Sequence, residues 1–138
     1  MLSKYFFTAL KKITAHAQNF STTLYLLDYN RNEDGLSELK ILMLDEPFGA
    51  LDAFTREELW CTLRDIQSER SVTVMLVTHD LREAVFLADT VYVMSNRPGR
   101  ILKRCEVNLP RPRDLDVTYT APFQAIVHEL RSLIGGKH

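Results

Sequence analysis

The sequence predicts an α/β fold: a sheet of parallel strands, ended by an antiparallel hairpin and flanked by N-terminal and C-terminal helices. Short apolar runs alternate with helix-like stretches from residue 39 onward. The run at residues 41–44 is apolar at every position, as expected for a strand buried on both faces. The 138 residues are 46% hydrophobic and 25% charged, which is typical of one soluble globular domain.

The beginning of the chain has a different pattern from the rest. Apolar residues recur near helical spacing over about the first 29 positions, lysines dominate the polar side, and no acid precedes Asp28. We expect an amphipathic helix followed by a polar connector, packed on the domain's own core or, alternatively, docked on a membrane surface or a partner. We therefore divide the chain into residues 1–39, the helix and connector, and residues 40–138, the main α/β part.

Strand and helix patterns alternate in the first half of the main part. The strand at 41–44 ends in charges and a proline. A capping-box pattern at residues 55–58 predicts a helix to about Glu69, with Leu59, Leu63 and Ile66 on one face. Residues 72–77 are rich in β-branched side chains and predict a second buried strand.

The second half of the main part predicts a third strand joined to the other two in one parallel sheet with right-handed crossovers. A fourth strand would pair antiparallel with the third across a turn. A last helix begins near a threonine and stops at two glycines. In chain order, the helix, strand, turn, strand and helix are expected at residues 80–88, 90–94, 96–99, 100–107 and 120–134.

Polar side chains follow the first two predicted strands. Asp45 and Glu46 come directly after the first strand, and His79 follows the second. Ligands of open α/β sheets bind beyond the carboxyl ends of the strands, so these groups converge if the strands are neighbours. One carboxylate can hold Mg²⁺ together with substrate phosphates, and the other can orient or deprotonate a water. The alternatives are solvated charges at a strand end and a histidine satisfied within the core.

Longer motifs give this site a family context. Residues 44–52, LDEPFGALD, resemble without a gap the Walker B strand and D-loop of ABC transporter ATPases. Residues 77–80, VTHD, look like the H-loop of the same family, and the similarity extends from about residue 40 to the C-terminus. Residues 95–101, SNRPGRI, and 107–113, VNLPRPR, look most like the nitrate, sulfonate and taurine importer branch.

The resemblance implies an incomplete P-loop-NTPase-type sheet, a role for four residues and the cofactors ATP and Mg²⁺. Asp45 would hold Mg²⁺ through water, and Glu46 would be the general base or water-orienting carboxylate. His79 would contact the γ-phosphate and bridge to the water at Glu46. Asp52, in the D-loop, would face a second ATPase subunit across a sandwiched nucleotide.

The sequence departs from this family at the phosphate-binding elements. Its five glycines stand at 35, 49, 99, 135 and 136, and none belongs to a G-x-x-x-x-G-K-[ST] motif. The glutamine loop and the glycine-rich signature are also missing. Because loop amides, the motif lysine and the metal stabilise a triphosphate together, we expect this chain alone to bind ATP weakly or not at all and not to hydrolyse it. The amphipathic helix could cover sheet surface that the family buries.

Three functional interpretations remain open. The chain is a partial ATPase subunit of an anion importer, a catalytically silent docking or regulatory module of a transporter complex, or a stand-alone α/β remnant. The first two imply a permease subunit as partner and a cytoplasmic location, peripheral to the inner face of the membrane. No run approaches the roughly 18 apolar residues of a membrane span, and Lys11 and Lys12 interrupt the only signal-peptide-like segment.

Charge and cysteine content exclude other classes. The net charge of -1 gives no general attraction to nucleic acid or anionic lipid. Cys61 and Cys105 are too few for a disulfide framework or a zinc site and are expected to be free thiols. The basic residues of the hairpin region are diluted by acids and lack interleaved aromatics, so we expect a solvated face and no nucleic-acid binding. These basic residues are Arg97, Arg100, Lys103, Arg104, Arg111 and Arg113.

Overall fold

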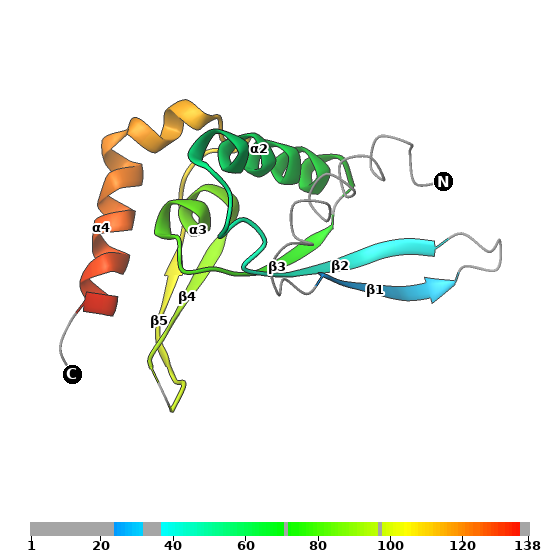
Figure 1. Ribbon diagram of the computed structural model, residues 1–138, viewed down its shortest axis with the longest axis horizontal. Helices are drawn as coiled ribbons and strands as arrows, with labels where there is room; N and C mark the ends of the chain where they lie inside the picture. The colour runs from blue at the N-terminus through cyan, green and yellow to red at the C-terminus, as the bar shows by residue number, and fades with distance from the viewer. Residues whose placement is uncertain (1–23, 32–36, 71, 97, 136–138) are drawn as a thin grey trace. The chain divides into compact units, whose positions relative to one another are not determined.

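The structure, a computed structural model, describes residues 24–31, 37–70, 72–96 and 98–135 (Figure 1). The fold is α/β, with a parallel strand pair, an antiparallel hairpin and helices, as the sequence predicts. The chain divides into two compact units, residues 1–79 and residues 80–138. Each unit is described by itself below.

Unit 1 is built on a three-stranded sheet in the order β1-β2-β3. Strand β2, Ser37–Asp45, pairs parallel with β3, Thr73–Val77, so the first two predicted strands are neighbours. Strand β1, Leu24–Arg31, pairs antiparallel with the other edge of β2. The predicted boundary between residues 39 and 40 falls within β2.

The prediction of a helix to about residue 29 is wrong in its last part, because residues 24–29 belong to strand β1. Leu24, Tyr25 and Leu26 form a short apolar run that suits either a helix or a strand. Register settles the choice in favour of a strand, since Leu24 pairs with Leu44 and Leu26 with Leu42, placing apolar residues in adjacent positions of the sheet. The remainder of the helix prediction, residues 1–23, lies outside the described residues.

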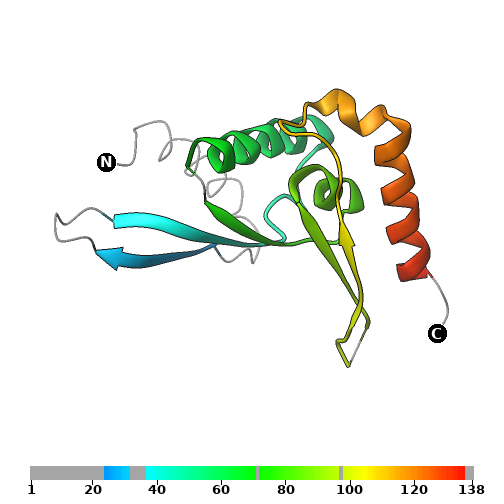
Figure 2. The same cartoon turned by 180° about the vertical axis from the view of Figure 1, so that it is seen from behind.

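Helix α2, Ala53–Arg70, lies along one side of the unit 1 sheet in both views (Figures 1 and 2). Its predicted inner face is confirmed, because Leu59, Leu63 and Ile66 are all buried. The helix begins earlier than predicted, because the actual cap lies three residues before Thr55, the first residue of the predicted capping box. Asp52 caps α2, accepting hydrogen bonds from Thr55 N at 3.1 Å and Thr55 Oγ1 at 2.7 Å. A carboxylate before the first turn satisfies helix N–H groups, which explains its use here.

The described residues of unit 2 form a hairpin and three helices, one of them a short 3-10 helix. Asp80 caps α3, Leu81–Leu87, as predicted, by accepting from the backbone N–H groups of residues 82 and 83. Strands β4, Thr90–Met94, and β5, Ile101–Glu106, form the predicted antiparallel hairpin. The expectation that this third strand joins the parallel sheet is wrong: β4 pairs with β5 in a separate two-stranded sheet.

The C-terminal helix α4, Ala121–Gly135, is confirmed near its predicted bounds. A short 3-10 helix, η1, Leu115–Tyr119, precedes α4 and was not predicted. Helix α4 packs against α3, η1 and β4. The buried side chains of unit 2 include Val85, Phe86 and Phe123.

Cys61 and Cys105 are free thiols, half-buried and buried respectively, as expected.

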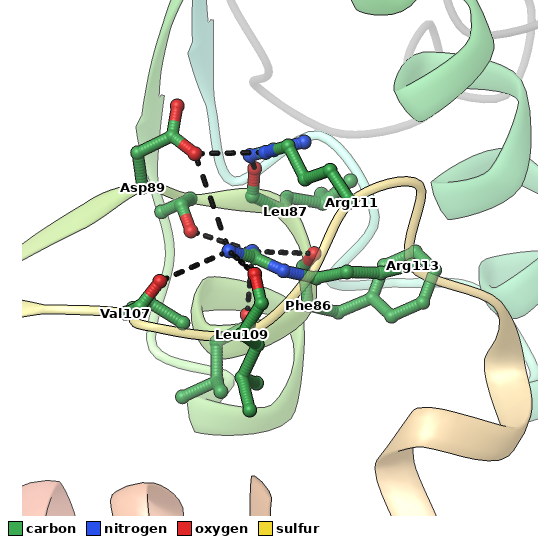
Figure 3. Close-up of polar contacts among 9 residues, drawn as sticks. Phe86, Leu87, Asp89, Val107, Leu109, Arg111 and Arg113 are labelled. Carbon is green, nitrogen blue, oxygen red and sulfur yellow. Dashed lines mark hydrogen bonds and ion pairs between the residues drawn. The ribbon is translucent and has the colours of Figure 1, made fainter.

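Arg113 is buried in unit 2 at the end of α3, so the expected solvated position is wrong for this residue (Figure 3). Its side chain is 1% exposed. Burial lowers the pKa of the guanidinium, neighbouring Arg111 lowers it further, and Asp89 opposes both. The guanidinium donates to five backbone carbonyls: Nη1 to Val85 at 3.1 Å, Phe86 at 3.1 Å and Ala88 at 2.6 Å, and Nη2 to Val107 at 3.2 Å and Leu109 at 3.5 Å.

Arg111 also binds a backbone carbonyl at the C-terminus of α3. Its Nη2 donates to Leu87 O at 2.8 Å, and its Nε donates to Asp89 Oδ1 at 2.8 Å. The last carbonyls of a helix lack intrahelical donors and carry partial negative charge, which favours cationic donors there. The two arginines therefore close the C-terminus of α3 and join it to the chain that leaves β5.

Candidate functional site

The carboxyl ends of β2 and β3 bring the predicted site residues together. Asp45 and Val77 are in-register partners at the ends of these parallel strands. Glu46 follows β2 directly and His79 comes two residues after the end of β3, so they emerge at the same edge of the sheet. Of the expected convergence, the contact between the Glu46 carboxylate and the His79 imidazole is found here, and it depends on the parallel pairing of neighbouring strands.

Glu46 and His79 are in direct contact. His79 Nδ1 lies 2.8 Å from Glu46 Oε1, and the two side chains are 81% and 38% exposed. An exposed polar contact of this kind contributes little to folding because water solvates both partners well. His79 is therefore not a core histidine, and the pair is accessible to a ligand from solvent.

The backbone at Glu46 turns sharply out of the sheet. Glu46 N donates to Val77 O at 2.8 Å, which extends the ladder between β2 and β3 by one residue. The φ angle of Glu46 is 45°, in the left-handed region that residues with a Cβ seldom occupy. This conformation ends the strand and starts the loop beside His79. The sequence gives no direct signal for it, because glutamate is not a residue type favoured there.

The loop after Glu46 returns to the pair. Pro47 and Phe48 are buried, and Leu51 N donates to Phe48 O at 3.2 Å. A methyl group added at Gly49 would lie 3.7 Å from Glu46 Oε2 and 3.9 Å from His79 Cε1. Gly49 thus borders the site, a role that the sequence indicates only through the Pro-Phe-Gly turn after the acidic pair.

Asp45 is the last residue of β2 and is exposed. A single accessible carboxylate next to a second one suits Mg²⁺, which proteins hold through one or two carboxylates plus phosphates and waters. Within the described ranges, no group of three or more histidine, cysteine, aspartate or glutamate side chains could hold a metal ion. Asp45 could supply one such oxygen ligand, and the remaining ligands would have to come from phosphate and water.

Asp52 has a local partner, since both of its carboxylate oxygens bind Thr55 at the start of α2. These hydrogen bonds lower the pKa of Asp52, the side-chain bond from Thr55 being the largest cause. The side chain is exposed. The structure thus gives Asp52 a role as a helix cap and does not place it in the Glu46–His79 pair.

The chemistry of the pair follows from its donors and acceptors. A glutamate carboxylate only accepts hydrogen bonds, so His79 Nδ1 is the donor whenever Glu46 is ionised. The carboxylate is thereby held in one orientation while staying accessible, as a group that receives a proton from water must be. This arrangement can orient or deprotonate a water at the carboxyl edge of the β2–β3 pair.

In the part of the chain that the structure describes, no helix has the length and apolarity needed to cross a membrane. No protein-family model matches the chain.

Comparison with curated proteins gives similar sequences for the C-terminal part of the chain. The aliphatic sulfonates import ATP-binding protein SsuB of Bacillus licheniformis is 54% identical over 92 residues, which cover 66% of this chain and 34% of that protein. The Bacillus subtilis protein of the same name is 45% identical over 91 residues, covering 66% and 34%. SsuB 1 of Pseudomonas aeruginosa is 52% identical over 75 residues, covering 54% and 30%.

The chain thus spans about a third of the length of the curated relatives it matches. Over the matched stretch, the predicted resemblance to ATP-binding subunits of ABC importers is confirmed.

Proposed function

We propose that this chain carries the magnesium-binding and general-base part of an ATP-hydrolysing site in an ABC importer for nitrate, sulfonate or taurine-like anions. Residues 40–138 would be the family-like part, and residues 1–39 would not be family-like. The observation that carries the proposal is the 2.8 Å contact between His79 Nδ1 and Glu46 Oε1 at the carboxyl ends of two parallel strands. The matched relatives are named aliphatic sulfonates import ATP-binding proteins, and this name supports sulfonates as the substrate class.

Asp45, Glu46 and His79 would each have a distinct role in hydrolysis. Asp45 would hold Mg²⁺, and the bound ion would neutralise charge on the phosphates of ATP. Glu46 would orient the attacking water and accept its proton. His79 would keep the Glu46 carboxylate in place through Nδ1 and contact the terminal phosphate. A general base of this kind is worth typically about 10²–10⁴ in rate.

Phosphate binding would depend on groups beyond these 138 residues, because the sequence contains no G-x-x-x-x-G-K-[ST] motif. Backbone amides and a lysine supply most of the stabilisation of a triphosphate in such sites. We therefore expect Mg·ATP to bind this chain only in the millimolar range, with no turnover. Calorimetric titration tests this, and micromolar affinity of the chain alone would contradict it.

A chimera tests the catalytic assignment itself. The matched stretch of the Bacillus licheniformis protein is replaced by the corresponding residues of this chain, and ATPase activity is measured. We expect activity in the chimera and a loss of about 10²–10⁴ with Glu46→Gln. Glu106→Gln is the matched control, because Glu106 also forms an exposed 2.8 Å ion pair, with Arg104. An active chimera in which both glutamine variants behave alike would refute the role of Glu46.

We also propose the partners that this function requires. A second ATP-binding subunit would face the loop that contains Asp52, and a permease subunit would hold the complex at the cytoplasmic face of the membrane. A catalytically silent docking module is the second candidate, supported by the lack of a phosphate-binding motif in the sequence. An inactive chimera whose parent chain still co-purifies with a permease would favour that candidate.

A further inference from the structure

The loop that connects β2 to α2, residues 47–52, lies beside the Glu46–His79 pair. A methyl group added at Gly49 would be 3.7 Å from Glu46 Oε2. Phe48, next to Gly49 in this loop, is 0% exposed and anchors it in the core. The position of the loop therefore limits where the Glu46 carboxylate can lie, and any group that holds the loop in place also acts on the pair.

The side chain of Arg56 holds the end of this loop. Arg56 Nη2 donates to Leu51 O at 2.9 Å, and the Nε atom of Arg56 is buried. Leu51 N donates in turn to Phe48 O at 3.2 Å, so both backbone polar groups of Leu51 are bound. A guanidinium presents its donors from a rigid planar group, which suits it to fix a carbonyl in one place. Arg56 therefore ties the loop to the start of α2.

The backbone conformation of Glu46 requires such anchors. Its φ of 45° is one that residues with a Cβ seldom adopt, and a strained backbone persists only where the surrounding structure holds it. Before the loop, Glu46 N is bound to Val77 O at 2.8 Å. After it, the chain is bound by Arg56 at Leu51 O. Without the second anchor, the backbone at Glu46 could relax and carry the carboxylate away from His79.

We propose that Arg56 is a positioning residue of the candidate site: it holds the 47–52 loop so that the Glu46 carboxylate stays against His79. The inference rests on the proposed function, in which Glu46 accepts a proton from water. A general base acts only within hydrogen-bond reach of the proton that it takes, and a misplacement of about 1 Å can cost about 10²-fold in rate. Arg56 thus affects the chemical step through the position of Glu46.

NMR spectroscopy of the 138-residue chain tests the positioning without any ATPase reaction. Arg56→Met keeps an unbranched side chain but has no donor for Leu51 O. Glu46→Ala removes the carboxylate and gives the His79 ring signals of a chain in which the contact is absent. At one pH, we expect the His79 ring signals of Arg56→Met to lie closer to those of Glu46→Ala than to those of the unaltered chain.

The chimera with the Bacillus licheniformis protein gives a second readout. Arg56→Met should lower kcat about 10²-fold and leave KM for Mg·ATP unchanged, because the groups that bind the phosphates lie elsewhere. Arg56→Lys should recover part of this loss, since an ammonium group can still donate to one carbonyl. A residue that only stabilised the fold would not separate kcat from KM in this way.

Arg64→Met is the matched control. Arg64 also lies on α2, its side chain is only 16% exposed, and it binds the neighbouring Asp65 at 2.8 Å. It is about 12 Å further along the helix axis than Arg56, so the His79 signals and kcat should not change. Circular dichroism identifies a variant that fails to fold. If Arg56→Met fails, Arg56→Gln, whose amide is too short to reach Leu51 O, decides the result.

Unchanged His79 ring signals in folded Arg56→Met would overturn the proposal, and so would equal shifts in Arg64→Met. A chimera in which Arg56→Met raises KM and leaves kcat unchanged would also overturn it. These measurements separate the positioning from the proposed function. Full activity with Glu46→Gln refutes the function, and the His79 signals still decide the role of Arg56. Activity that falls with Glu46→Gln but not with Arg56→Met refutes the positioning alone.

Discussion

Replacing Arg113 by methionine tests whether the buried guanidinium holds unit 2 together. Methionine keeps an unbranched chain of comparable length but has no N–H donors. The substitution therefore removes five hydrogen bonds, three to the end of α3 and two to the carbonyls of Val107 and Leu109. The carbonyls stay in place, and with Arg113 only 1% exposed, little water reaches them.

The magnitude follows from two opposing contributions. Each lost hydrogen bond costs about 1 kcal/mol net, or about 5 kcal/mol for the five. Burial of the guanidinium is itself unfavourable, because a charged group loses solvation by water, and its removal returns roughly 2 kcal/mol. We expect the Arg113→Met chain to lose about 3 kcal/mol of unfolding free energy. Arg113→Lys should lose nearly as much, because an ammonium group cannot reach five carbonyls in two directions.

Urea unfolding followed by circular dichroism measures the loss as a lower midpoint with an unchanged slope. Arg111→Met is the matched control: Arg111 is 33% exposed and makes one carbonyl bond and one bond to Asp89, so about 1 kcal/mol is expected. Equal losses for the Arg113→Met and Arg111→Met variants would refute the reasoning. A loss below about 0.5 kcal/mol at Arg113 would do the same.

Three further predictions concern unit 1. Thr55→Val removes the main cause of the lowered pKa of Asp52, so this pKa should rise in an NMR titration. Because the folded-state pKa is depressed, the stabilisation from Asp52 is complete above its ordinary pKa of about 3.9 and disappears as pH falls through the lower folded value. Gly49→Leu should reduce chimera ATPase activity at least tenfold, while Gly49→Ala, which makes only ordinary contacts, should retain it. Leu42→Ala should cost about 3 kcal/mol in urea unfolding, whereas Met75→Ala should cost less than about 1 kcal/mol.

Each of these predictions has a contradicting result. An Asp52 pKa that does not rise with Thr55→Val would show that another group lowers it. Full activity of the Gly49→Leu chimera would mean that the space beside the Glu46–His79 pair is not used. Equal costs for the Leu42→Ala and Met75→Ala variants would contradict the difference between the two faces of the sheet.

The convergence of the candidate site could be predicted because it depends on local rules. Glu46 and His79 each come two residues after a short apolar run, and strand ends in neighbouring parallel strands meet at one edge. The hairpin could be predicted for a similar reason, since the turn near Pro98 separates two runs of strand character. Periodicity and turn chemistry are properties of adjacent residues, so the sequence displays them directly.

Other features depend on partners distant in the chain. Leu24–Arg31 fits a strand only because the apolar residues of β2 lie opposite, and a periodicity count over one segment cannot include that pairing. Arg113 was expected at the surface because its charge is visible in the sequence, whereas the five carbonyls that it binds are not. The separate hairpin sheet likewise depends on which strands meet, which no single segment determines.

The backbone at Glu46 has a consequence for protein engineering. A design method that optimises conformational energy alone would place glycine or asparagine at a φ of 45°, since these residues enter the left-handed region most readily. The resulting protein would fold with less strain and would have lost the carboxylate that faces His79. Thermostabilised versions of this chain should therefore keep position 46 fixed and seek their gains elsewhere.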